Sequence, residues 1–167
     1  MFLCLLSLSP QTFVCRTFSD VSVLRCADSL GDFMGGYLPL HQLQEEGWRL
    51  LPLLLWLEAS IYALDEANEA AIQQKTQPQC DETTGWKLIR AELTKAELLP
   101  DVRIEAELAE GARYWRLERV LCNTEHPKEA EIERCARGKS FDYRLMHLVA
   151  LKQTKFRKLF FFFFFFV

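Results

Sequence analysis

The stretch WRLLPLLLWLEASIYALDEANEAAIQQKTQ, residues 48–77, decides the fold class. Within residues 53–64 its only polar residues are Glu58 and Ser60. A helix that is apolar on nearly every face packs at the centre of a bundle or spans a membrane. This apolar run is shorter than the about 20 residues that a membrane span requires, and it ends in acidic residues, so we predict a central core helix. Pro52 is expected in its first turn, where the missing N–H group is not needed.

The sequence on either side of this segment also predicts helices, because apolar residues recur at a spacing near 3.6. Gly35–Gly36 is expected to end the first helix. Asp101, directly after Pro100, is expected to begin the helix over residues 101–122. No window shows the alternation of a strand, so we predict an all-α bundle of about six helices with one central apolar helix. Helices are expected near residues 20–34, 53–75, 86–99, 101–122, 127–137 and 140–151, with a short turn near 40–46.

The chain length predicts one domain, because 167 residues are enough to bury one substantial core. We expect a single helical domain over residues 19–152, preceded by a disordered leader over residues 1–18. Residues 153–167 form a basic and phenylalanine-rich tail that is expected to lie outside the fold.

This tail contains seven consecutive phenylalanines, Phe160–Phe166. Because phenylalanine codons are rich in pyrimidines, we interpret the run as a translated polypyrimidine tract of an intron, and the helical domain as incomplete. An exposed aromatic run is also an aggregation hazard. The alternative is an interfacial membrane anchor, in which Lys155, Arg157 and Lys158 meet lipid headgroups. The apolar residues of the tail are too few to span a bilayer.

Composition and charge narrow the class of protein. Half of the residues are hydrophobic and 26% are charged, which is ordinary for a globular domain and too apolar for a disordered chain. The net charge of −3 argues against a nucleic-acid-binding protein, which usually has a basic face. The six cysteines form no C-x-x-C pair, so we expect reduced thiols and a cytoplasmic location. The alternative location is an organelle, because the acid-free residues 1–19 faintly resemble a transit peptide.

One acidic cluster has the chemistry of a metal site. The central helix ends in LDEANEA, which contains Asp65, Glu66 and Glu69. Asp65 and Glu69 are four residues apart and therefore share one helical face, with Glu66 beside them. Like charges at this spacing repel unless solvent separates them or a cation bridges them. Because Mg²⁺ prefers carboxylate oxygens and substrate phosphates, we predict these three residues as Mg²⁺ ligands. The alternative is a solvated helix end.

This cluster resembles the motif of the class I isoprenoid (terpenoid) synthase superfamily. In that family an inward-facing helix carries D-D-x-x-D/E, which binds Mg²⁺ and diphosphate, whereas residues 65–69 here read DEANE. The segment SFDYRLMHLVAL, residues 140–151, resembles poorly characterised plant helical proteins of terpenoid-synthase-like type. The resemblance implies an apolar pocket along residues 53–64 for an isoprenoid diphosphate. The second acidic motif of the family does not follow in this sequence, which implies a truncated or inactive protein.

Three hypotheses of function follow. The first is an isoprenoid-synthase-like domain that binds Mg²⁺-diphosphate but is incomplete or inactive. The second is a non-enzymatic helical interaction or scaffold protein with a protein partner, whose acidic cluster faces solvent. The third is a peripheral membrane protein that binds lipid through residues 155–167.

Other chemically interesting residues favour structural roles, and no catalytic residue is identified. The histidines lack a convincing Ser or Cys partner, and the tryptophans suit core packing. The arginines of the helix over residues 101–122 suit internal ion pairs. These residues are His41, His126 and His147; Trp48, Trp56, Trp86 and Trp115; and Arg113, Arg116 and Arg119.

Overall fold

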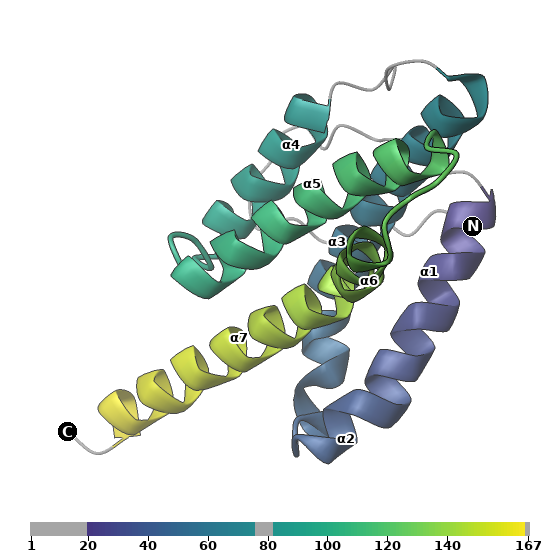
Figure 1. Ribbon diagram of the computed structural model, residues 1–167. Helices are drawn as coiled ribbons and strands as arrows, with labels where there is room; N and C mark the ends of the chain where they lie inside the picture. Colours follow the sequence, from purple (N-terminus) through teal and green to yellow (C-terminus); the bar gives the residue numbers. More distant parts are fainter. Residues whose placement is uncertain (1–19, 76–81, 166–167) are drawn as a thin grey trace.

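The computed structural model describes residues 20–75 and 82–165, and within these residues the chain forms helices and no strand (Figure 1). The prediction of an all-α fold is confirmed, and the number of helices is near the predicted six. The elements are α1 (Asp20–Asp32), the π-helix η1 (Phe33–Tyr37), α2 (Leu38–Leu40), α3 (Gln44–Gln74), α4 (Glu82–Lys95), α5 (Val102–Cys122), α6 (Glu129–Gly138) and α7 (Phe141–Phe165). The predicted leader, residues 1–18, lies outside the described residues.

Helix α3 is the centre of the bundle. It packs against α1 on one side and against α4, α5 and α7 on the other (Figure 1). Leu54 and Leu57 have no exposed surface. Full burial of one such side chain contributes about 1.5–3 kcal/mol, which explains why this segment occupies the core.

Two expectations about helix ends were wrong. Helix α3 begins at Gln44, so Pro52 lies in its interior and not in its first turn. Proline there costs about 3 kcal/mol, because it has no N–H group and its ring meets the preceding turn. Burial of the neighbouring Leu50 and Leu54 favours the continuous helix. Gly35–Gly36 does not end α1: it lies inside η1, and no described glycine has the positive φ of a left-handed helix cap.

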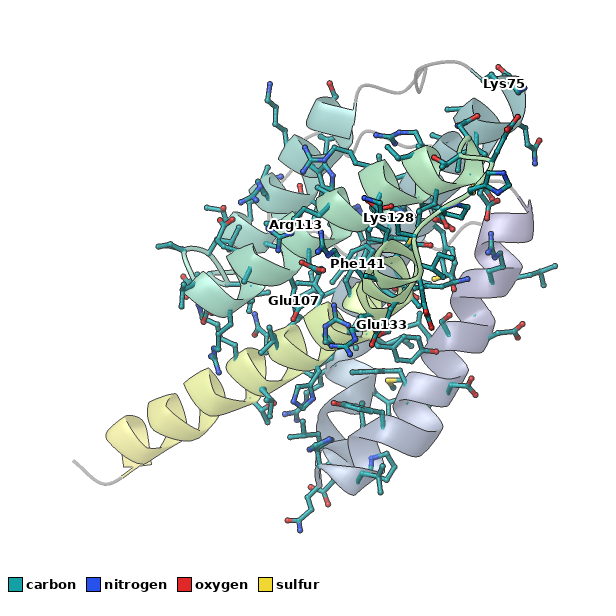
Figure 2. The ribbon with its side chains drawn as sticks, in the orientation of Figure 1. Lys75, Glu107, Arg113, Lys128, Glu133 and Phe141 are labelled. Atoms are coloured by element: carbon teal, nitrogen blue, oxygen red, sulfur yellow. The ribbon has the colours of Figure 1, made fainter. Side chains whose placement is uncertain are left out.

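Helix α7 crosses α5 at a point where only glycine fits. A Cβ atom on Gly111 would lie 2.4 Å from the ring of Phe141, which is 2% exposed. Figure 2 shows Phe141 where α5, α6 and α7 meet. The Phe141 ring contacts Trp86 and Trp115, which lie in the core as predicted. Trp48, for which core packing was also expected, lies on the surface and is 78% exposed.

The backbone of α7 continues as a helix to Phe165 and extends away from the other helices (Figure 1). The predicted domain boundary at residue 152 therefore falls inside this helix. Packing reaches at least Thr154, which is 7% exposed, and Gln153 donates a hydrogen bond of 2.9 Å to the carbonyl of Ala96. Within the described residues, no helix combines the length and the apolar character that a membrane span requires.

Candidate functional site

The acidic end of α3 contacts α1 through Arg25. The guanidinium of Arg25 lies between two carboxylates, with Nη2 3.9 Å from Asp65 Oδ2 and Nη1 3.7 Å from Glu69 Oε1. Asp65 Oδ1 also accepts a 2.9 Å hydrogen bond from Trp115 Nε1 of α5. Asp65 and Glu69 thus share one face of α3, and the cation between them is a side chain of the protein.

The electrostatics of this cluster are those of a partly exposed ion-pair network. Burial, followed by repulsion from Asp65, raises the pKa of Glu69 above its ordinary value, while Arg25 acts in the opposite direction. The side chain of Glu69 is 48% exposed and that of Arg25 is 42% exposed, so solvent screens their interaction. Glu66 is half-buried beside them. The acidic cluster is therefore bound into the α1–α3–α5 contact and does not simply face solvent.

A buried amide extends the network toward α5. Asn68, which is 2% exposed, donates a 2.7 Å hydrogen bond to Glu118 Oε2 and accepts one of 2.5 Å from Arg119 Nη1. The hydroxyl of Tyr114 donates a hydrogen bond of 2.5 Å to the other oxygen of Glu118. Burial, with this hydrogen bond as a further cause, raises the pKa of Tyr114. The network fixes the register of α3 against α5.

The arrangement of carboxylates bears on the predicted Mg²⁺ site. Among residues 20–75 and 82–165, no group of three or more His, Cys, Asp or Glu side chains has the geometry to hold a metal ion. Both oxygens of Asp65 already face donors, Arg25 on one side and Trp115 on the other. The assignment of Asp65, Glu66 and Glu69 as Mg²⁺ ligands stays a prediction.

Sequence reasoning did not single out a second carboxyl group, two turns earlier on α3. Glu58 has no exposed surface, and neither of its carboxyl oxygens has a hydrogen-bond partner within the described part of the chain. Burial, followed by repulsion from Asp142 of α7, raises the pKa of Glu58 to about 8. Burial is also the main cause that raises the pKa of Asp142. The only signal for this site in the sequence is a single acid inside the apolar run.

Polar groups of α1 and α3 lie near the Glu58 carboxyl group. The hydroxyls of Ser29 and Tyr62 lie 2.6 Å apart and share a hydrogen bond. Cys26 has no exposed surface, and burial, followed by repulsion from Glu58, raises the pKa of its thiol to about 12. Cys26, Cys122 and Cys135, the cysteines within the described residues, are free thiols as predicted.

His41, which follows α2, and His147 of α7 lie next to each other. The rings of His41 and His147 have centres 4.7 Å apart, and Tyr37 lies 4.7 Å from the first and 5.0 Å from the second. Nδ1 of His147 is buried and has no hydrogen-bond partner among the described residues. Burial, followed by repulsion from His41, lowers the pKa of His147. The predicted packing role of these two histidines agrees with their ring contacts.

Comparison with protein-family models, curated proteins and solved structures found no match for this chain. The assignment of function therefore depends on the geometry described above.

Proposed function

We propose that this chain is a non-enzymatic helical interaction domain of isoprenoid-synthase-like type, located in the cytoplasm. One observation carries the proposal: the acidic motif on α3, which resembles a Mg²⁺-diphosphate motif, is bridged by Arg25. A guanidinium supplies positive charge between the two carboxylates, so they do not require a Mg²⁺ ion to balance their repulsion.

The position of Arg25 gives the acidic motif a structural use. Because Arg25 belongs to α1, its contacts with Asp65 and Glu69 attach that helix to the central helix. Its guanidinium carbon also lies 5.1 Å from the centre of the Tyr62 ring, which adds a cation–π contact. An isoprenoid diphosphate would compete with these contacts, whereas a protein partner would leave them intact.

Large apolar side chains on the surface support a protein partner. Leu40 is 81% exposed and Trp48 is 78% exposed, and the two lie on either side of the short turn between α2 and α3. Exposed tryptophans are enriched at protein interfaces, because they bury a large area at a low cost in side-chain entropy.

Calorimetric titration of pyrophosphate in the presence of Mg²⁺ tests the proposal. We expect no saturable binding by the unmodified chain, and the same result for Asp65→Asn and for the control Glu133→Gln on α6. We also expect Arg25→Gln to bind Mg²⁺ more tightly than the unmodified chain, because two carboxylates lose their cation. Mg²⁺-dependent pyrophosphate binding by the unmodified chain that disappears in Asp65→Asn would contradict the proposal and restore the Mg²⁺-diphosphate hypothesis.

A second function, peripheral membrane binding, is favoured by the course of α7. This helix extends away from the bundle and carries Lys155, Arg157 and Lys158 ahead of the phenylalanine run (Figure 1). Basic residues next to apolar ones favour binding to anionic lipid surfaces. Sedimentation with anionic and with neutral vesicles tests this function. Membrane binding predicts salt-sensitive sedimentation with anionic vesicles that is lost when the three basic residues are changed to Glu. Equal binding by the unmodified chain and this variant would contradict it.

A further inference from the structure

Among the described residues, the carboxyl group of Glu58 is the acidic group that is buried without a hydrogen-bond partner. It has no exposed surface, and among the described residues neither of its oxygens has a hydrogen-bond partner, although the nearby Ser29 hydroxyl of α1 lowers its pKa in part. An ionised carboxylate in such a place has lost its hydration without any compensation, whereas a protonated one has lost much less. The site therefore favours the neutral acid.

The groups that face Glu58 from the packed helices reinforce this preference. From α7 come Asp142, a second acid that is half-buried, and Tyr143. From α1 come the Cys26 thiol and the Ser29 hydroxyl, which already shares a hydrogen bond with Tyr62 of α3. None of these groups carries a positive charge at neutral pH.

The nearby cations are engaged elsewhere. Arg25 lies between Asp65 and Glu69, at the acidic end of α3. Backbone hydrogen bonds lower the pKa of Asp142, and Arg144 does so to a smaller extent; Arg144 also donates a 3.0 Å hydrogen bond to Glu107 of α5. Two further acids act on this region: Asp65 of α3 on Asp142, and Asp32 at the end of α1 on Tyr143.

We propose that the protonated carboxyl group of the buried Glu58 keeps α1 packed against α3, and that loss of this proton, which the nearby Asp142 opposes, releases α1. The proposal goes beyond the interaction function and does not require it. Helix α1 is the element that can move, because its contacts are with α3 and the adjoining η1, whereas α5 contacts α3, α6 and α7. Once α1 moves away, water can reach the carboxylates and hydrate them.

The sign of the pH dependence follows from the burial. The pKa of Glu58 is about 8 with α1 in place and its ordinary value is 4.5, so the packed state binds more protons than the open state between these two pH values. The equilibrium constant for opening of α1 is therefore expected to rise up to tenfold per pH unit across this window and to level off above it. The Cys26 and Tyr62 groups titrate at higher pH and do not contribute within the window.

Amide hydrogen exchange of the full chain between pH 5 and pH 8.5, corrected for the intrinsic exchange rates, tests the proposal. Protection of the α1 amides is expected to fall by up to tenfold per pH unit and to stay below that of the α5 amides, which exchange only through global unfolding. In Glu58→Gln, which has nearly the same volume and cannot ionise, α1 should keep its protection throughout. In Asp142→Asn the plateau should begin at a lower pH, because repulsion of the Glu58 carboxylate is removed.

Two results would overturn the proposal. One is the same pH dependence of α1 protection in Glu58→Gln as in the unmodified chain, because the carboxyl would then have no part in it. The other is the same level of protection in α1 and α5 at every pH, which would indicate that α1 opens only when the whole chain unfolds. Should Glu58→Gln fail to fold, Glu58→Met serves the same purpose, since it fills the volume without any polar atom. A matched control is Glu133→Gln, which removes an exposed carboxyl on α6 and should leave the profile unchanged.

Discussion

The side of α7 that faces α4 and α5 differs from the side that faces α3 and η1 in how its ionisable groups are satisfied, although Trp86 Nε1 of α4, among the described residues, is also buried without a hydrogen-bond partner. On the first side, Lys152 Nζ donates a 2.8 Å hydrogen bond to the carbonyl of Leu98 and lies 3.3 Å from Asp101 Oδ2. On the second side, among the described residues, the Glu58 carboxyl and Nδ1 of His147 are buried without a hydrogen-bond partner. Charged groups thus stabilise one interface in their ionised forms, while the other interface requires neutral forms.

This difference implies different responses to mutation and to pH. An interface built on packing and on satisfied ion pairs should be sensitive to changes of side-chain volume and insensitive to pH near neutrality. An interface that contains neutral forms of ionisable groups should weaken when pH changes, even though no contact is removed. The predictions below separate these responses.

The largest effect is expected from Phe141→Ala at the α5 interface. The ring is 2% exposed and contacts Trp86 and Trp115, so its removal leaves a cavity among large side chains. We expect a loss of about 3–5 kcal/mol in the free energy of unfolding, measured by urea denaturation. The exposed Val102→Ala on α5 is the control and should change stability by less than about 0.5 kcal/mol. A cost of Phe141→Ala as small as that of the control would show that this interface is not a packed one.

A smaller loss is expected from Gly111→Ala, where the Phe141 ring of α7 lies against the backbone of α5. The new Cβ atom would lie 2.4 Å from the Phe141 ring, so the helices must separate or the ring must move. We expect a loss of about 1–3 kcal/mol, as for other overpacked sites. Gly31→Ala on α1 is the matched control, because no atom lies within 4 Å of its Cβ position. It should stabilise the chain by about 0.4–1 kcal/mol, and a loss in both variants would argue against close packing as the cause.

The start of α5 and the π-helix η1 show which parts of the fold can be predicted from sequence. Pro100 and Asp101 predict a helix start, and Asp101 Oδ1 accepts hydrogen bonds from the backbone N–H groups that follow it. That signal is local. Gly35–Gly36 is a local signal for a helix end, but Phe33 stacks on Tyr37 within the segment and contacts Tyr143 of α7, which is distant in sequence; both contacts favour the helix.

The candidate site also has one part that local sequence predicts and another that depends on contacts between distant residues. The spacing of four residues places Asp65 and Glu69 on one face of α3, which depends on helix geometry alone. Their partners come from other helices, and Trp115 is 50 residues away from Asp65 in the chain. A single sequence contains no measure of that proximity. Glu58 is conspicuous within its apolar run, but its lack of a partner depends on what α1 and α7 place around it.

Substitution of Asp101 is expected to have an intermediate effect and to sharpen the comparison on the ion-paired side. Asp101→Ala removes the cap of α5 and the ion pair with Lys152, and should cost about 1–2 kcal/mol. Asp101→Asn keeps a capping oxygen and should lose less. Equal losses in the two variants, by urea denaturation at pH 7, would mean that the cap contributes nothing.

The same residue predicts the behaviour of this side in acid. Burial alone would raise the pKa of Asp101, but hydrogen bonds from Arg103 and from the helix backbone lower it to about 2. The carboxylate therefore stabilises the fold above its ordinary pKa, near 4, and this contribution is lost as pH falls toward 2. Between pH 5 and pH 9 the difference in stability between the unmodified chain and Asp101→Asn should be constant.

The smallest effect is expected at His147, where the other side of α7 should respond to acid near neutrality. Because burial and His41 lower the pKa of His147, the unfolded chain binds more protons than the folded one below about pH 7. Stability should therefore fall as pH decreases from 7 to 5, and His147→Leu should reduce this slope. The exposed His126→Gln is the control and should keep it. The Glu58 carboxyl acts in the opposite direction, since its contribution decreases as pH rises toward 8, so removing both groups should flatten the profile on this side of α7. A slope that persists in the double variant would place the pH dependence elsewhere and remove the contrast between the two interfaces.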